Sequence, residues 1–93
     1  MEVKIARSFI KDFKLAPKII QQQADKVIQK LIIIDTIQHS DIHFIKMEGQ
    51  RKGENYYRIR IGDWRMGVEC IKSKVIVLRL LSRGAIYKKF PPN

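Results

Sequence analysis

Arginine residues alternate with apolar residues near the middle of the chain. Arg58 and Arg60 are two positions apart, and Arg65 follows a short Gly-Asp segment. An arginine side chain stays charged at physiological pH and can bind a phosphate through two parallel hydrogen bonds. The chemistry available to these residues is therefore phosphate binding and the stabilisation of negative charge.

The Gly62-Asp63 dipeptide predicts how these arginines are arranged. Glycine supplies the positive φ angle of a two-residue turn, so residues 56–61 and 64–71 are expected to form a β-hairpin. The expected pairs are Ile61–Trp64, Arg60–Arg65, Ile59–Met66, Arg58–Gly67 and Tyr57–Val68. Side chains alternate between the faces of a strand. One face then carries Tyr57, Ile59, Ile61, Trp64, Met66, Val68 and Cys70, and the other carries Tyr56, Arg58, Arg60, Arg65, Gly67 and Glu69.

The second of these faces concentrates like charge. Two arginines directly opposite each other in a hairpin are unfavourable on their own, and a polyanionic ligand is a natural reason for them. Neutralisation by Glu54, Asp63 and Glu69 is the alternative, but these acids leave an excess of arginine. We therefore interpret the basic face as a binding site for a polyanion.

Other residues extend this predicted site. Arg79 lies in a third predicted strand, residues 75–81, and can join the basic face. Tyr56 is on the same face and is a candidate for stacking on a base. Lys46, Arg51 and Lys52 are expected to lead a ligand or partner to the site, although an ordinary solvated loop explains them nearly as well.

The N-terminal part of the chain predicts two helices. A short strand is expected over residues 2–7, and Ser8 is a good N-cap for a helix that ends near Pro17. A longer helix follows, with an apolar stripe formed by Ile20, Ala24, Val27, Leu31 and Ile34.

The rest of the chain predicts strands and loops. Residues 35–43 and 48–55 read as loops, residues 44–47 as a strand and residues 82–93 as a tail. The fold class that follows is α+β. We expect a single domain over residues 1–93, with an N-terminal helical hairpin packed on a small, mainly antiparallel sheet of four or five strands.

The charge of the whole chain agrees with a polyanionic ligand. The 93 residues have a formal net charge of +10, and residues 46–93 hold twelve basic and four acidic residues, against seven and five in residues 1–45. The longest apolar run, residues 31–34, is far shorter than the about 20 residues of a membrane span. Without a secretory signal or a second cysteine, a cytoplasmic protein with no membrane partner is expected.

Three remaining residue types carry little chemistry. His39 and His43 lie in a predicted loop without further ligands, so no metal site is expected. Cys70 on the apolar face is expected to be a small buried thiol rather than a nucleophile. Trp64 is expected to pack in the core.

The sequence resembles the RelE/ParE family of bacterial toxins from type II toxin–antitoxin systems. The segments that carry the resemblance are Ala6-Arg7-Ser8-Phe9-Ile10-Lys11-Asp12-Phe13, Tyr57-Arg58-Ile59-Arg60-Ile61-Gly62-Asp63-Trp64-Arg65-Met66-Gly67 and Leu80-Leu81-Ser82-Arg83-Gly84-Ala85-Ile86-Tyr87. The middle segment is the specific one. The resemblance covers nearly the whole chain.

The resemblance implies a ribosome-dependent mRNA endoribonuclease that acts in the ribosomal A site, uses neither metal nor cofactor, and is held inactive by an acidic cognate antitoxin, also in higher-order complexes. It implies catalytic roles for Arg60, Arg65, Arg83 and Tyr87, with Arg58 as a further basic residue of the site. Arg65 with Arg83 or Arg79 would stabilise the charge on the phosphorane, and Tyr87 would stack on a base or hold the 2′-hydroxyl region.

Two positions depart from the pattern of RelE-type enzymes. Some of them have lysine where Arg60 stands, and many have histidine where Ser82 stands. Arginine is a poor proton acceptor. Four interpretations therefore stay open: an enzyme in which Arg60 acts through its charge, a ParE-like protein that inhibits DNA gyrase without catalysis, a degenerate inactive toxin, and a plain nucleic-acid-binding domain.

Overall fold

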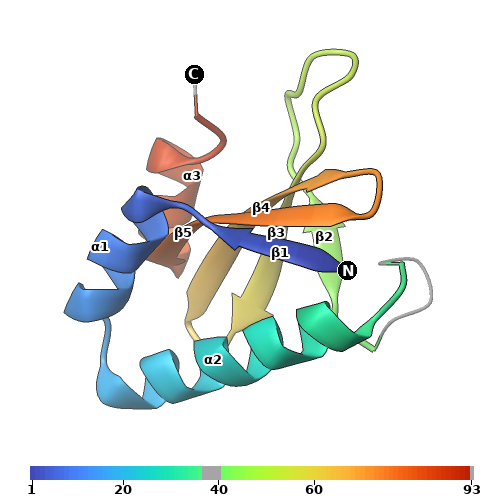
Figure 1. Cartoon of the computed structure of the whole chain (residues 1–93). Helices are drawn as coiled ribbons and strands as arrows, with labels where there is room; N and C mark the ends of the chain where they lie inside the picture. Colours follow the sequence, from blue (N-terminus) through green and yellow to red (C-terminus); the bar gives the residue numbers. More distant parts are fainter. Residues whose placement is uncertain (37–40, 93) are drawn as a thin grey trace.

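The chain folds around one five-stranded sheet with the order β1-β5-β4-β3-β2 (Figure 1). The computed structural model describes residues 1–36 and 41–92. The strands are β1 (Glu2–Ile5), β2 (Phe44–Lys46), β3 (Tyr56–Ile61), β4 (Trp64–Ile71) and β5 (Lys74–Ser82). Only the β1–β5 pair is parallel among these pairings, so the sheet is mainly antiparallel, as predicted.

Helices α1 (Arg7–Leu15) and α2 (Lys18–Ile33) pack on one face of the sheet. Helix α1 contacts β5, and α2 contacts β1 and β3 (Figure 1). Pro17 is the N-cap of α2, and the Gln21 side chain donates a hydrogen bond to the Phe13 carbonyl at 2.7 Å across the turn. The predicted α+β fold, with two N-terminal helices on a mainly antiparallel sheet, is confirmed.

The apolar face of the hairpin forms most of the core with these helices. Ile20, Ala24 and Leu31 are buried, and Val27 and Ile34 pack beside them, so the predicted stripe is confirmed. From the sheet, the core takes Ile59, Ile61, Met66, Val68, Val75, Val77 and Leu80. Burial of this many apolar side chains is the main source of stability for a chain of this size.

The predicted register of the β3–β4 hairpin is confirmed at every pair, including Arg60 opposite Arg65. Gly62 has a φ angle of +58°, the left-handed conformation for which glycine was expected in the turn. The hairpin therefore presents an apolar face to the helices and the opposite face to α3 (Arg83–Lys89) and solvent.

Helix α3 was not predicted, because residues 82–93 read as a tail. It is only seven residues long, and packing rather than intrinsic propensity explains it. Ile86 and Phe90 are buried together with Met47 and Leu81 in a second, smaller core on the face of the sheet opposite α1 and α2.

The start of the chain also differs in detail from the prediction. Strand β1 ends at Ile5, and α1 begins at Arg7, so Ala6 and not Ser8 is the N-cap. The Ser8 hydroxyl instead donates to the Leu78 carbonyl at 2.6 Å, which ties α1 to β5. No helix in the described ranges is long and apolar enough to cross a membrane.

Candidate functional site

Four arginines and one tyrosine gather on the face of the sheet opposite α1 and α2. Arg58 and Arg60 come from β3, Arg65 from β4, and Arg83 and Tyr87 from the first and second turns of α3. We call these five residues the basic cluster. Burial lowers the pKa of Arg65, the charges of Arg60, Arg83 and Arg58 lower it further, and Tyr87 opposes them. The fold therefore brings these side chains close enough for the other four to influence the pKa of Arg65.

The hairpin turn holds Arg65 in place. Its Nη1 group donates to the carbonyls of Gly62 at 2.9 Å and Trp64 at 2.8 Å. The planar guanidinium is thus anchored at one corner, and in the described part of the chain no residue accepts a hydrogen bond from its Nε or Nη2. An anchored arginine loses little conformational entropy when it binds a phosphate.

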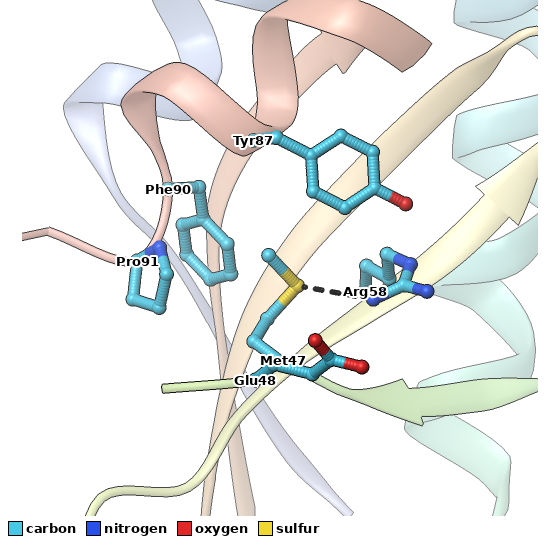
Figure 2. A pocket seen from close by; sticks show the side chains of 6 residues that line it. All are labelled: Met47, Glu48, Arg58, Tyr87, Phe90 and Pro91. Carbon is cyan, nitrogen blue, oxygen red and sulfur yellow. Dashed lines mark hydrogen bonds between the residues drawn. The ribbon is translucent and has the colours of Figure 1, made fainter. Parts of the chain in front are cut away.

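Arg58 lies against the ring of Tyr87. The guanidinium carbon is 5.3 Å from the ring centroid, a cation–π contact, and Nη1 is 3.6 Å from the Met47 sulfur (Figure 2). Tyr87 is 57% exposed. The ring therefore offers free surface on which an RNA base can stack.

A cavity of about 380 Å³ opens beside this contact (Figure 2). Its lining consists of Met47, Glu48, Arg58, Tyr87, Phe90 and Pro91. The volume is within the range of ligand pockets. The sequence predicted only Arg58 and Tyr87 as site residues, because the others come from the end of the predicted strand 44–47, a loop and a predicted tail.

Gly67 explains how Phe90 can form a wall of this cavity. A Cβ atom at Gly67 would lie 2.9 Å from the Phe90 ring, closer than such contacts occur. Glycine is therefore required where the C-terminal segment crosses β4. An isolated glycine in a predicted strand is the sequence signal for such a close approach.

Arg79 pairs with Gly67 and so lies on the predicted basic face, but it is not part of the basic cluster. Its Nε donates to Asp12 Oδ2 at 2.7 Å and its Nη2 to Asp12 Oδ1 at 3.2 Å, an ion pair with α1. The register shifts between Gly67 and Val68, which pair with Arg79 and Val77, so Leu78 is the extra residue of a β-bulge. Because of this bulge, Val77 lies in the main core although Arg79 shares the face of Gly67. Arg79 is absent from the charges that act on Arg65.

Three further predicted residues also lie outside the basic cluster. Lys46 pairs with Tyr57, so it lies on the helix-covered face of the sheet, not on the basic face. Arg51 and Lys52 are exposed on the β2–β3 loop, which projects beyond the sheet (Figure 1). Their suggested role in guiding a ligand stays a prediction.

Tyr56 is on the basic face as predicted, but it is packed rather than free. Its ring makes an edge-to-face contact with Phe90, with the centroids 5.6 Å apart. Burial, followed by the charges of Glu69 and Glu54, raises the pKa of its hydroxyl. Tyr87 is therefore the more accessible surface for stacking.

Cys70 and Trp64 lie beside the main core, as expected for residues of the apolar face. Cys70 is half-buried beside the main core, and burial followed by the charge of Glu69 raises the pKa of its thiol to about 11. Trp64 packs against the same core. His39 lies outside the described residues, and among those described no three His, Cys, Asp or Glu side chains are grouped to hold a metal ion.

No ion pair in the described ranges includes an arginine of the basic cluster. The ion pairs found there are Lys30–Asp41 and Arg79–Asp12. Arg60 and Arg83 are exposed and Arg58 and Arg65 are half-buried, so the unpaired positive charge of the cluster can attract an anionic ligand.

Comparison with known proteins identifies relatives with this fold. The toxin RelE3 of Methanocaldococcus jannaschii is 33% identical over 91 residues, which cover 98% of this chain and all of the relative. The toxin–antitoxin complex RelB-RelE from Methanococcus jannaschii contains a chain that superposes with a TM-score of 0.77 and 31% identity, over 95% of this chain and 99% of that one. The DinJ-YafQ complex of E. coli gives a TM-score of 0.67 at 17% identity, over 92% and 97% of the chains, which shows a shared fold.

No protein-family model matches the chain. Identity above 30% over nearly the full length of both proteins is nevertheless sufficient to assign it, and the predicted resemblance is confirmed. The chain belongs to the RelE family and is a toxin of a toxin–antitoxin system.

Proposed function

We propose that this toxin is an endoribonuclease that cuts mRNA in the A site of the ribosome and thereby blocks translation. The observation that carries the proposal is the basic cluster, in which an exposed tyrosine lies with four arginines that form no ion pair with a carboxylate in the described ranges. Phosphate binding dominates the affinity of proteins for nucleic acids, and aromatic stacking orients bases in single-stranded RNA. Membership of the RelE family supports the ribosome as the place of action.

The cluster suits the charge that develops during RNA cleavage. When a 2′-hydroxyl attacks the adjacent phosphate, the phosphorane gains negative charge, which preorganised cations stabilise. Arg65 is held by the turn carbonyls and Arg83 is beside it, so these two are assigned to the phosphorane. Arg60 and Arg58 bind the flanking phosphates, and Tyr87 stacks on a base next to the cleaved bond.

We further propose that an acidic antitoxin neutralises the toxin by covering this cluster. Carboxylates that pair with the arginines would remove the field that attracts RNA and would compete for the same donors. The similar chains from Methanococcus jannaschii and E. coli were each solved with an antitoxin. A complex of this kind, also in a higher-order assembly, is the expected resting state.

The test is primer-extension mapping of a defined mRNA in a reconstituted translation reaction. Wild-type toxin should produce cuts at A-site codons, and Arg65→Ala should reduce them by about 100- to 1,000-fold, the cost of removing one donor to a developing oxyanion. The matched control is Arg7→Ala, which removes the same charge from an exposed position in α1. It should retain cleavage.

Two results would contradict the nuclease proposal. Growth arrest on expression without RNA cuts would favour inhibition of DNA gyrase. The absence of both growth arrest and RNA cuts would favour a degenerate toxin. That result would agree with the two departures from the family pattern, Arg60 in place of lysine and Ser82 in place of histidine.

A further inference from the structure

An acidic side chain lines the cavity beside the basic cluster. Glu48 shares this lining with Arg58 and Tyr87 (Figure 2). A carboxylate repels the phosphates that such a surface attracts. We therefore ask whether Glu48 makes a favourable contact with a ligand that compensates for this repulsion.

The loop that carries Glu48 is held firmly to the sheet. The Gln50 side chain donates to the carbonyls of Met47 at 2.6 Å and Tyr56 at 2.8 Å, and it accepts from the Tyr56 amide at 2.8 Å. The Met47 amide also donates to the Tyr56 carbonyl at 2.9 Å. These bonds fix the turn after β2 to the start of β3, two residues before Arg58. Glu48 is thus positioned by a rigid support, as a recognition residue needs to be.

Glu48 is not used by the protein itself. No ion pair or side-chain hydrogen bond in the described ranges includes its carboxylate, and Arg58 contacts Tyr87 and Met47 instead. An ionised carboxylate accepts hydrogen bonds through both oxygens and donates none. The cavity therefore offers a paired acceptor beside an aromatic ring, with apolar walls from Phe90 and Pro91.

We propose that this cavity is a nucleobase subsite in which Glu48 selects guanine. The base would stack on Tyr87 and present its Watson–Crick edge to the carboxylate, as bases in single-stranded RNA do. Guanine alone among the four RNA bases places two donor groups, N1–H and the 2-amino group, side by side on that edge. Uracil offers one donor, and adenine and cytosine combine a donor with an adjacent acceptor that the carboxylate repels. This inference rests on the proposed RNA substrate.

The test measures binding to four hexanucleotides UUXUUU that differ only at X. Their 2′-fluoro sugars prevent cleavage. Wild type should bind the X = G hexamer about tenfold more tightly than the other three, within the range of discrimination by one paired contact. In Glu48→Gln, which keeps the shape but has one acceptor and one donor group, the preference should fall to about twofold.

The matched control is Glu54→Gln, which removes a carboxylate from the same loop but outside the cavity lining. It should keep the tenfold preference while changing overall affinity as Glu48→Gln does, because both variants gain one unit of positive charge. Glu48 is exposed, so thermal unfolding of Glu48→Gln should match wild type. Equal or undetectable binding of the four hexamers by wild type, or a preference that persists in Glu48→Gln, would overturn the subsite.

Cleavage mapping of the same variants separates this inference from the proposed function. If wild type prefers guanine but never cuts mRNA on ribosomes, the subsite stands and the nuclease proposal fails. If Glu48→Gln loses cleavage at all codons but keeps the guanine preference, Glu48 acts in proton transfer and the subsite is wrong.

Discussion

The two faces of the β3–β4 hairpin have opposite chemistry although their residues alternate along the same strands. On one face Ile59 and Met66 are 2% and 0% exposed under the helices. On the other, Arg58, Arg60 and Arg65 face α3, the cavity and solvent. Stability thus depends on one face and the proposed chemistry on the other, so substitutions in adjacent residues should affect different properties.

The arginines show a second contrast. Arg79 is held by both oxygens of Asp12, whereas the four arginines of the basic cluster have no carboxylate partner in the described ranges. The first kind joins a helix to the sheet, and the second kind leaves positive charge for a ligand. A count of basic residues cannot distinguish the two, because the difference lies in the partner that the fold supplies.

The largest expected effect is on stability, from the apolar face. Met66→Ala should lower the free energy of unfolding by about 2–5 kcal/mol, since Met66 is fully buried and a cavity would remain. Urea denaturation followed by circular dichroism measures this change. Lys26→Ala, on the exposed side of α2, is the control and should change stability by less than about 0.5 kcal/mol. A small loss in Met66→Ala would show that the core does not depend on this face.

The next effect concerns the paired arginine. Asp12→Ala should destabilise the protein by about 2 kcal/mol, because it leaves Arg79 unpaired and also removes the acceptor of the Leu80 amide at 3.0 Å. Arg79→Ala should cost less, because Asp12 keeps that amide. Arg79→Ala should also retain the RNA cleavage that Arg65→Ala loses. Equal loss of cleavage in both arginine variants would contradict the distinction between paired and open arginines.

The burial of Cys70 on the apolar face can be tested through the reactivity of its thiol and through the pH dependence of stability. A thiol with a pKa of about 11 is far less ionised at pH 8 than one with the ordinary value of 9.0, so alkylation by iodoacetamide should be about 100-fold slower than for a free thiol. Above the ordinary pKa the unfolded chain releases this proton and the folded chain keeps it. Stability should therefore fall between about pH 9 and pH 11, compared with Cys70→Ala. Fast alkylation at pH 8 would contradict the burial of this thiol.

The smallest expected effect is on the stability of Arg65→Ala. Loss of the hydrogen bonds to Gly62 and Trp64 should be offset by relief of repulsion from Arg60, so the free energy of unfolding should stay within about 0.5 kcal/mol of wild type. Urea denaturation checks this value alongside the cleavage measurement. A loss above about 1.5 kcal/mol would show that Arg65 serves the turn rather than a ligand.

The fold could be predicted where the signal was local. The Gly62-Asp63 turn determines the hairpin register, and the spacing of Ile20, Ala24 and Leu31 determines the buried side of α2. Arg58, Arg60 and Arg65 follow from that register. Arg83 and Tyr87 came from the family resemblance, and the structure brings both to the other three. What could not be predicted was the lining of the cavity by Glu48, Phe90 and Pro91.

The sequence by itself determined which residues share a face of the hairpin, because alternation along a strand and the geometry of a two-residue turn depend only on near neighbours. Only the tertiary structure decided the bulge in β5, the Arg79–Asp12 pair and the crossing of Phe90 over Gly67. Each of these joins elements far apart in the chain and depends on how they pack together. The arginines of the basic face follow from the sequence pattern, whereas the cavity beside them forms only when α3 and the C-terminal segment pack on the sheet.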